Sequence, residues 1–151
     1  MTNWSPLLAI APNLKVGDPT AMDTLVGPVI SAAQRGRIES YIQAGADEGA
    51  EIIVDGRRPS HMERGFYVAP TLIAGCRADM SPVQEEIFGP VVVVIPFDDE
   101  DEGIAIANGT EFGLYDYVFS QDTDRAYRIA RQLRSGNVGI NSAQRNHEAP
   151  F

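Results

Sequence analysis

Two adjacent acidic residues are the first candidates for chemistry in this sequence. Glu85 and Glu86 precede Phe88 and the pair Gly89–Pro90 in the stretch QEEIFGP. A carboxylate can accept hydrogen bonds from neighbouring hydroxyl groups, so one of these acids could hold a polyhydroxylated ligand. Successive helical positions point about 100° apart, and we therefore expect at most one of the two acids to face such a ligand. The alternative is that both acids are solvated and that Phe88 fills the core.

Residues that could act as nucleophiles or metal ligands are few. The sequence has one cysteine, Cys76, and two histidines, His61 and His147, which are too far apart for a Cys/His metal site. We expect Cys76 to be structural, because a nucleophile needs an activating partner and Arg77 is a neighbour in sequence only. The acids at 98–102 lack the central glycine of a calcium loop and suit the first turn of a helix. We predict no metal site.

Length and charge restrict the class of protein. The 151 residues are 44% hydrophobic, which is enough for one domain with a core. The net charge of −9 argues against a surface that binds nucleic acid. No stretch approaches the roughly 20 apolar residues of a membrane span, and the amino terminus lacks the basic residues of a secretory signal. We therefore expect a cytoplasmic protein that binds neither nucleic acid nor a membrane.

The first half of the chain predicts one helix followed by two strands. Ser31 and Gln34 form a capping box, in which the Ser31 hydroxyl accepts from the backbone and the Gln34 side chain reaches back to the cap. The helix is expected to end near Gly49. Residues 51–56 and 65–75 are then typical of β-strands. An apolar stripe runs along the helix through Ile38, Tyr41, Ile42 and Ala46.

The acidic pair itself is predicted to lie on a short helix. Ser81 is the expected N-cap, Pro82 takes the first helical position, and Gly89–Pro90 ends the helix after about two turns. Residues 91–95 follow as an apolar run without alternation. Such a run is typical of a strand that is covered on both faces, as in a parallel sheet.

From residue 91 onward the predicted order is strand, helix, strand, helix, strand. The two helices fall at 98–109 and 122–136, and the later strands at 114–120 and 137–141. Asp122 is the expected cap of the second helix. This order favours parallel crossovers, so we predict an α/β fold with a mostly parallel sheet and flanking helices.

Seven short motifs occur in an order and spacing that can be compared with those of known families. They are LKVGDP, GPVIS, GFYVAPTL, QEEIFGPVVVV, EFGL, GNVGIN and the final APF. In this order and spacing, the chain from about Leu14 to Phe151 resembles the carboxy-terminal part of the catalytic domain of the NAD(P)-dependent aldehyde dehydrogenase superfamily. The resemblance implies a divergent segment at 1–13 and a partial aldehyde dehydrogenase catalytic domain at 14–151, without the dinucleotide-binding domain.

The resemblance also implies functions for particular residues. Glu86 would bind the nicotinamide ribose hydroxyls of NAD or NADP, and Phe88 would pack near the nicotinamide end of the cofactor. Phe151 would be an aromatic residue of the substrate channel. The nucleophilic cysteine and the general-base glutamate of the family belong upstream of Leu14 and have no counterpart in this sequence, so no catalytic residue is assigned.

One strand departs from the family pattern. Tyr115, Asp116 and Tyr117 stand where many family members have small residues. This difference indicates either a strand that packs in another way or an altered neighbouring pocket.

Two functions are compatible with these observations. The first is a truncated aldehyde dehydrogenase, an oxidoreductase for small-molecule aldehydes, which alone is inactive and binds NAD or NADP weakly or not at all. The alternative is a non-catalytic binding or assembly module that completes a separately encoded half, joins a homologous subunit or forms a homo-oligomer.

Overall fold

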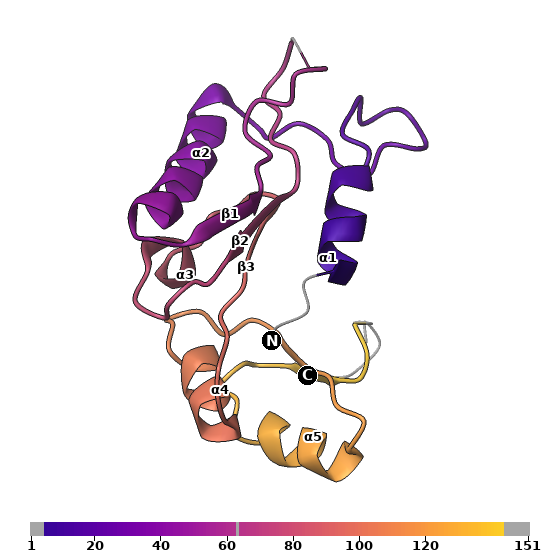
Figure 1. The fold of residues 1–151 in the computed structure, drawn as a ribbon. Helices are drawn as coiled ribbons and strands as arrows, with labels where there is room; N and C mark the ends of the chain where they lie inside the picture. The colour runs from indigo at the N-terminus through magenta and orange to yellow at the C-terminus, as the bar shows by residue number, and fades with distance from the viewer. Residues whose placement is uncertain (1–4, 63, 144–151) are drawn as a thin grey trace. The chain divides into compact units, whose positions relative to one another are not determined.

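The computed structural model describes residues 5–62 and 64–143 and divides into two units after Pro96 (Figure 1). The helices of the first unit are α1 (Ser5–Ile10), the 3-10 helix η1 (Ala11–Asn13), α2 (Ala32–Asp47) and α3 (Ser81–Gln84). Its strands are β1 (Glu51–Val54), β2 (Thr71–Ala74) and β3 (Val91–Val93). The second unit contains α4 (Glu100–Ala107), β4 (Asp116–Val118), α5 (Thr123–Ala130) and β5 (Val138–Ile140).

The strands of the first unit form a sheet in the order β1-β2-β3. β1 runs antiparallel to β2, whereas β3 runs parallel to β2 with Thr71 opposite Val91. In the second unit β4 and β5 are also parallel, with Asp116 opposite Val138. Two of the three strand pairings among the described residues are therefore parallel, and the predicted α/β fold with a mostly parallel sheet is confirmed.

The core of the first unit lies between α2 and one face of this sheet. Ile38 and Ile42 of α2 and Ile73 of β2 are fully buried there, together with Met80. Alternate residues of β3 pack against this cluster, because successive side chains of a strand point to opposite faces. Figure 1 shows α1 on the other side of the sheet from α2.

The predicted burial of β3 on both faces is wrong for this chain. Val92, in the middle of the strand, is 52% exposed. β3 is an edge strand of the sheet, and the small helix α1 covers only part of the face that Val92 occupies. The described residues therefore cover one face of this apolar strand and only part of the other face.

The ends of α2 were predicted correctly from local chemistry. The Ser31 hydroxyl accepts a hydrogen bond from the Gln34 amide at 3.1 Å. The helix ends at Asp47, and Gly49 takes a positive φ of 96°, a conformation that glycine adopts without steric cost.

The helix α3 differs from its prediction in length and cap. It covers one turn, and its N-cap is Met80 without a side-chain bond. Both the amide and the hydroxyl of Ser81 donate to the carboxylate of Glu48, which follows α2. A residue 33 positions away therefore satisfies the amino terminus of α3, which a local capping pattern cannot reveal.

In the second unit the helix caps follow the sequence pattern. Asp99 accepts from the Glu102 amide at the start of α4, and Asp122 accepts from the Arg125 amide at the start of α5. The predicted order from β3 to β5 is also found, and β3 pairs with β2 in the first unit while β4 pairs with β5 in the second. None of the described helices combines the length and apolar character needed to cross a membrane.

Candidate functional site

The segment that carries the acidic pair is an extended loop between α3 and β3. Glu85 lies just past the helix with φ −118° and ψ 150°, so the expectation that the two acids lie on a helix is wrong. In an extended chain neighbouring side chains point to opposite sides. Glu85 accepts a hydrogen bond from the Tyr41 hydroxyl of α2, whereas Glu86 is exposed and has no hydrogen-bond or ion-pair partner among the described residues.

The aromatic residue of the loop points outward. Phe88 is 75% exposed, so the alternative in which this ring fills the core is wrong. Ile87 is buried in its place and joins the cluster around Ile38. The loop therefore presents Glu86 and Phe88 to the surface and inserts the residue between them into the core.

Phe88 also has an unusual backbone conformation. Its φ is +58°, which costs about 1–2 kcal/mol for a residue other than glycine. The side chain of Gln34 helps to hold this conformation, because its Nε2 donates to the Ile87 carbonyl at 3.1 Å and to the Phe88 carbonyl at 3.2 Å. The capping box is thus only half correct, since Gln34 binds the loop and does not reach back to the cap.

A close approach of the loop to α2 explains the glycine that follows. A Cβ added to Gly89 would lie 2.6 Å from the Cδ1 atom and 2.8 Å from the Cγ1 atom of Ile38, so a larger residue would require this fully buried side chain to shift. Gln34, Ile38 and Tyr41 are spaced by four and three residues, so they lie on one face of α2. This face supports the whole loop through two hydrogen-bonding residues and one apolar contact.

Glu85 is linked to Arg37 through the Tyr41 hydroxyl. Arg37 donates to the Tyr41 hydroxyl at 3.2 Å, and its guanidinium lies 5.5 Å from the centre of the Tyr41 ring. Tyr41 in turn donates to Glu85. The sequence pattern indicates Tyr41 only as a member of the apolar stripe, so the bond from its hydroxyl to Glu85 was missed. The bonds from the Gln34 amide to the loop carbonyls were missed as well. Glu86 is left as the acid of the pair that is available to a ligand.

The single thiol is unsuited to nucleophilic chemistry. Cys76 is buried, and its Sγ lies 3.7 Å from the Ile73 carbonyl. Burial raises the pKa of the Cys76 thiol, which is opposite to the change that an active nucleophile needs. The prediction of a structural cysteine agrees with this environment. The described residues also contain no cluster of acidic, histidine and cysteine side chains that could hold a metal ion.

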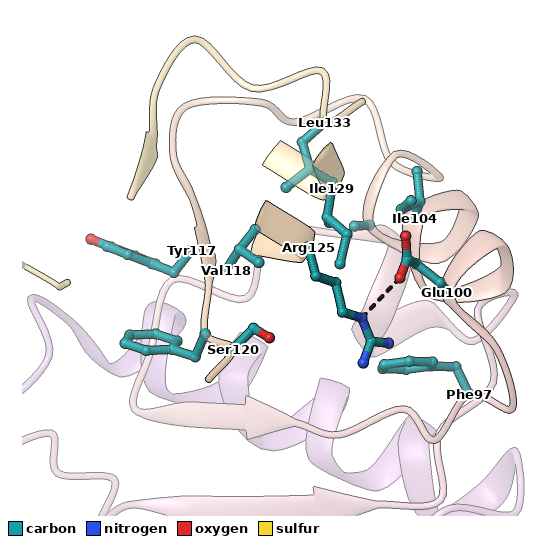
Figure 2. Close-up of a pocket in the computed structure, with 12 residues that line it drawn as sticks. Phe97, Glu100, Ile104, Tyr117, Val118, Ser120, Arg125, Ile129 and Leu133 are labelled. Atoms are coloured by element: carbon teal, nitrogen blue, oxygen red, sulfur yellow. Dashed lines mark hydrogen bonds and ion pairs between the residues drawn. The ribbon is translucent and has the colours of Figure 1, made fainter. Parts of the chain in front are cut away.

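The second unit contains a cavity of about 410 Å³ between α4, α5 and β4 (Figure 2). Its lining includes Ile104, Val118 and Ile129. Arg125 reaches across to Glu100, where its Nε donates to the carboxylate at 2.8 Å. Hydrogen bonds from Arg128, and to a smaller extent from Arg125, lower the pKa of Glu100. The carboxylate is therefore already occupied by two arginines.

The strand that departs from the family pattern borders this cavity. Tyr117 lines it, and the Tyr115 and Tyr117 rings lie 4.7 Å apart. The carboxylate of Asp116 accepts from the Ser135 hydroxyl. The two rings therefore pack against each other and Tyr117 adjoins the cavity, and the choice between a repacked strand and an altered pocket stays a prediction. Phe151 lies outside the described residues.

Comparison with known proteins identifies the family. The sequence profile of the aldehyde dehydrogenase family matches residues 5–151. A putative aldehyde dehydrogenase of Staphylococcus saprophyticus is 42% identical over 139 residues, which are 91% of this chain and 29% of that protein. The chain therefore spans less than a third of that relative's length.

Solved structures agree with this assignment. An aldehyde dehydrogenase of Bartonella henselae is similar with a TM-score of 0.90 and 42% identity, over 94% of this chain and 30% of that one. The Mycobacterium tuberculosis aldehyde dehydrogenase complexed with NAD+ gives a TM-score of 0.92 at 39% identity, over 97% of this chain and 30% of that one. The predicted family is confirmed: this chain belongs to the aldehyde dehydrogenase family.

Proposed function

We propose that this chain supplies part of the catalytic domain of an NAD(P)-dependent aldehyde dehydrogenase, which oxidises an aldehyde to a carboxylic acid. The observation that carries this proposal is the exposed Glu86, which has no hydrogen-bond or ion-pair partner among the described residues and stands in a loop fixed by α2. A similar protein of the same family, the Mycobacterium tuberculosis aldehyde dehydrogenase, was solved in complex with NAD+, which supports a nicotinamide cofactor as the ligand. We also propose that the protein acts in the cytoplasm.

The exposed face of the loop fits the ribose end of a nicotinamide cofactor. A free carboxylate can accept hydrogen bonds from both ribose hydroxyls, and bonds to a charged acceptor contribute about 1.5–3 kcal/mol each. The outward ring of Phe88 provides an apolar surface for the nicotinamide end. Because buried contacts already fix the loop, little conformational entropy is lost when a ligand binds there.

The chain is proposed to be inactive alone. The cofactor, when bound, supplies the hydride acceptor, and Glu86 and Phe88 would orient it. The reaction also needs a nucleophile, and the one thiol of this sequence is buried with a raised pKa. One ribose contact does not offset the entropy of association, so we expect weak cofactor binding or none.

An activity assay of the purified chain tests this function. Aldehydes of several sizes would be added with NAD or with NADP, and the reduced cofactor would be followed by its absorbance. We expect no aldehyde-dependent signal above a sample without protein. Sustained aldehyde-dependent reduction of the cofactor by this chain alone would contradict the proposal.

The open edge of β3 favours a second function, that of an assembly module. In this function the chain joins a separately encoded half of the enzyme or a homologous subunit. An unpaired strand edge invites association, because its backbone groups lack partners. Size-exclusion chromatography with light scattering would test this function, since a monomer at all concentrations that binds no other aldehyde dehydrogenase chain would argue against it.

A further inference from the structure

A second cavity of the first unit lies between α2 and the connection from β1 to β2. It has a volume of about 350 Å³. Its polar lining comes from two arginines and two residues with hydroxyl groups, namely Arg35, Arg58, Ser60 and Tyr67. No acidic side chain is among the described residues that line it. The cavity is therefore lined mainly by groups that donate hydrogen bonds.

One carboxylate stands close to both arginines. Among the residues that the structure describes, Glu39 is the acid that pairs with them, since its Oε1 lies 3.9 Å from Arg35 Nε and 3.6 Å from Arg58 Nε. Both distances exceed that of a normal hydrogen bond. This oxygen is buried and accepts no hydrogen bond from the described residues. One negative charge thus faces two positive charges and is hydrogen-bonded to neither.

The guanidinium groups have donors to spare. Arg35 makes one long bond, from Nη1 to the Gly65 carbonyl at 3.5 Å, and its guanidinium carbon lies 5.9 Å from the centre of the Phe66 ring. The Arg58 side chain is 77% exposed and makes no hydrogen bond within the described part of the chain. Since a guanidinium carries several N–H groups in a planar fork, both arginines can still bind an acceptor.

The backbone holds Arg58 in a conformation that is unfavourable for its type. Its φ is +49°, in the left-handed region, and it precedes Pro59. The chain just before it is fixed, because Arg57 forms an antiparallel bridge with Val68 and its side chain binds Asp55 at 2.6 Å. Non-glycine residues in this conformation occur often at binding and catalytic sites.

We infer that Arg35 and Arg58 form a binding site for a phosphate group, carried either by inorganic phosphate or by a small phosphorylated molecule. A guanidinium binds two phosphate oxygens through parallel N–H groups, so two arginines can satisfy one phosphate between them. The hydroxyls of Ser60 and Tyr67 line the same cavity and can donate to further oxygens. A phosphate would supply the acceptors that Glu39 does not.

This site is separate from the loop that presents Glu86. Arg35 and Glu39 are four positions apart and share one face of α2. Gln34 and Ile38, which support the loop, each precede them by one position and so lie about 100° away around the helix. The inference therefore does not rest on the proposed function, and either can fail without the other.

Titration of the full chain with phosphate tests the inference. Nuclear magnetic resonance spectra of the ¹⁵N-labelled chain would be recorded while inorganic phosphate replaces chloride at constant ionic strength. We expect saturable shifts at millimolar phosphate for the amides of residues 35, 58 and 65. The net charge of −9 repels anions from the chain as a whole, so such shifts report the local arginines.

A second titration distinguishes the two sources of the phosphate group. Glycerol 3-phosphate would be added in place of inorganic phosphate under the same conditions. Tighter binding of glycerol 3-phosphate would assign the site to a phosphorylated small molecule, and tighter binding of inorganic phosphate would assign it to the free ion. Both results support the inference.

Variants should change the phosphate affinity in opposite directions. Arg35→Gln and Arg58→Gln should each raise the dissociation constant about fivefold or more, because each removes a charged donor. Glu39→Gln should lower it about threefold, because it removes the negative charge that competes for the arginines. Arg57→Gln is the matched control and should have little effect, since Asp55 already binds the Arg57 side chain.

Circular dichroism confirms that each variant is folded. An unchanged phosphate affinity in both Arg35→Gln and Arg58→Gln would overturn the inference, and so would weaker binding in Glu39→Gln. Absence of saturable shifts in the unmodified chain, or equal shifts with chloride alone, would overturn it as well.

Discussion

Glu86 in the first unit and Glu100 in the second are held in two different ways. Glu86 is exposed and has no partner within the part of the chain that the structure describes, and its position is set by the burial of Ile87 in the core and by the bonds from Gln34. Glu100 is held by Arg125 and Arg128, which are themselves half exposed. Packing fixes the first acid and leaves its oxygens free, whereas ion pairs fix the second acid and occupy its oxygens. Glu86 can therefore bind a ligand through its carboxylate, because that carboxylate is not needed to hold the residue in place.

The largest effect should come from removing the packing that fixes the first acid. Ile38→Ala should lower the free energy of unfolding by about 2–5 kcal/mol, because it leaves a cavity beneath the loop at a fully buried site. Urea denaturation followed by circular dichroism measures this change. Ile104→Ala in the second unit is the control and should cost less, because Ile104 is only partly buried and lines an existing cavity. Equal losses would remove the distinction between the two units.

The next effect concerns the free acid itself. In a chimera, residues 5–151 of this chain would replace the matched segment of the Mycobacterium tuberculosis relative. Glu86→Gln should weaken NAD binding about tenfold, since a neutral acceptor replaces a charged one. Glu85→Gln should change the dissociation constant little, because Gln can still accept from Tyr41. Isothermal titration calorimetry measures the NAD dissociation constant of both variants. An equal loss of NAD affinity in both would show that Glu85 and Glu86 do not differ in their contribution to cofactor binding.

A smaller effect is expected from the polar support of the loop. Gln34→Ala removes the two bonds to the carbonyls of Ile87 and Phe88 and should cost about 1 kcal/mol. It should also speed amide hydrogen exchange at residues 87–89. Gln43→Ala is a matched control on the same helix, where the side chain bonds to the side chains of Asp47 and Arg57 and not to the loop. Unchanged exchange at 87–89 in Gln34→Ala would show that Gln34 does not hold the loop.

The smallest effect is expected at Glu100. Its pKa is lowered in the folded state by Arg128 and Arg125, so the ion pairs stabilise the fold above the ordinary value of 4.5 and this contribution is lost as the pH falls through the lowered pKa. Glu100→Gln should therefore be slightly less stable than the unmodified chain at neutral pH and equal to it in acid. Added salt should reduce the neutral-pH difference, because the charges are exposed. A difference that persists in acid and in high salt would point to packing instead.

Sequence reasoning succeeded where a structure depends on neighbouring residues. The caps at Ser31 and Asp122 involve contacts over three residues, and both were predicted. It failed where a contact is made by a residue that is distant in the sequence. Gln34 bonds to carbonyls more than 50 positions away, and Glu48 replaces the expected cap of α3.

The candidate site shows the same division. The acidic pair and its aromatic neighbour were singled out from the sequence, but the directions of their side chains were not. Phe88 points outward because Ile87 fills the core and Gly89 lies against Ile38, and both contacts are tertiary. The exposure of Val92 was missed for a related reason, since an apolar run indicates what a strand prefers and not which neighbours are present.

The helix α2 binds the segment around Glu86 at both ends. Near its start Gln34 holds the loop beside Phe88, and just after its end the Glu48 carboxylate holds Ser81 at the beginning of α3. The helix α2 and the segment 81–89 are therefore expected to move together. Any partner that displaces α2 would carry Glu86 with it, so contact at the outer surface of this helix could change how the acid is presented without touching it.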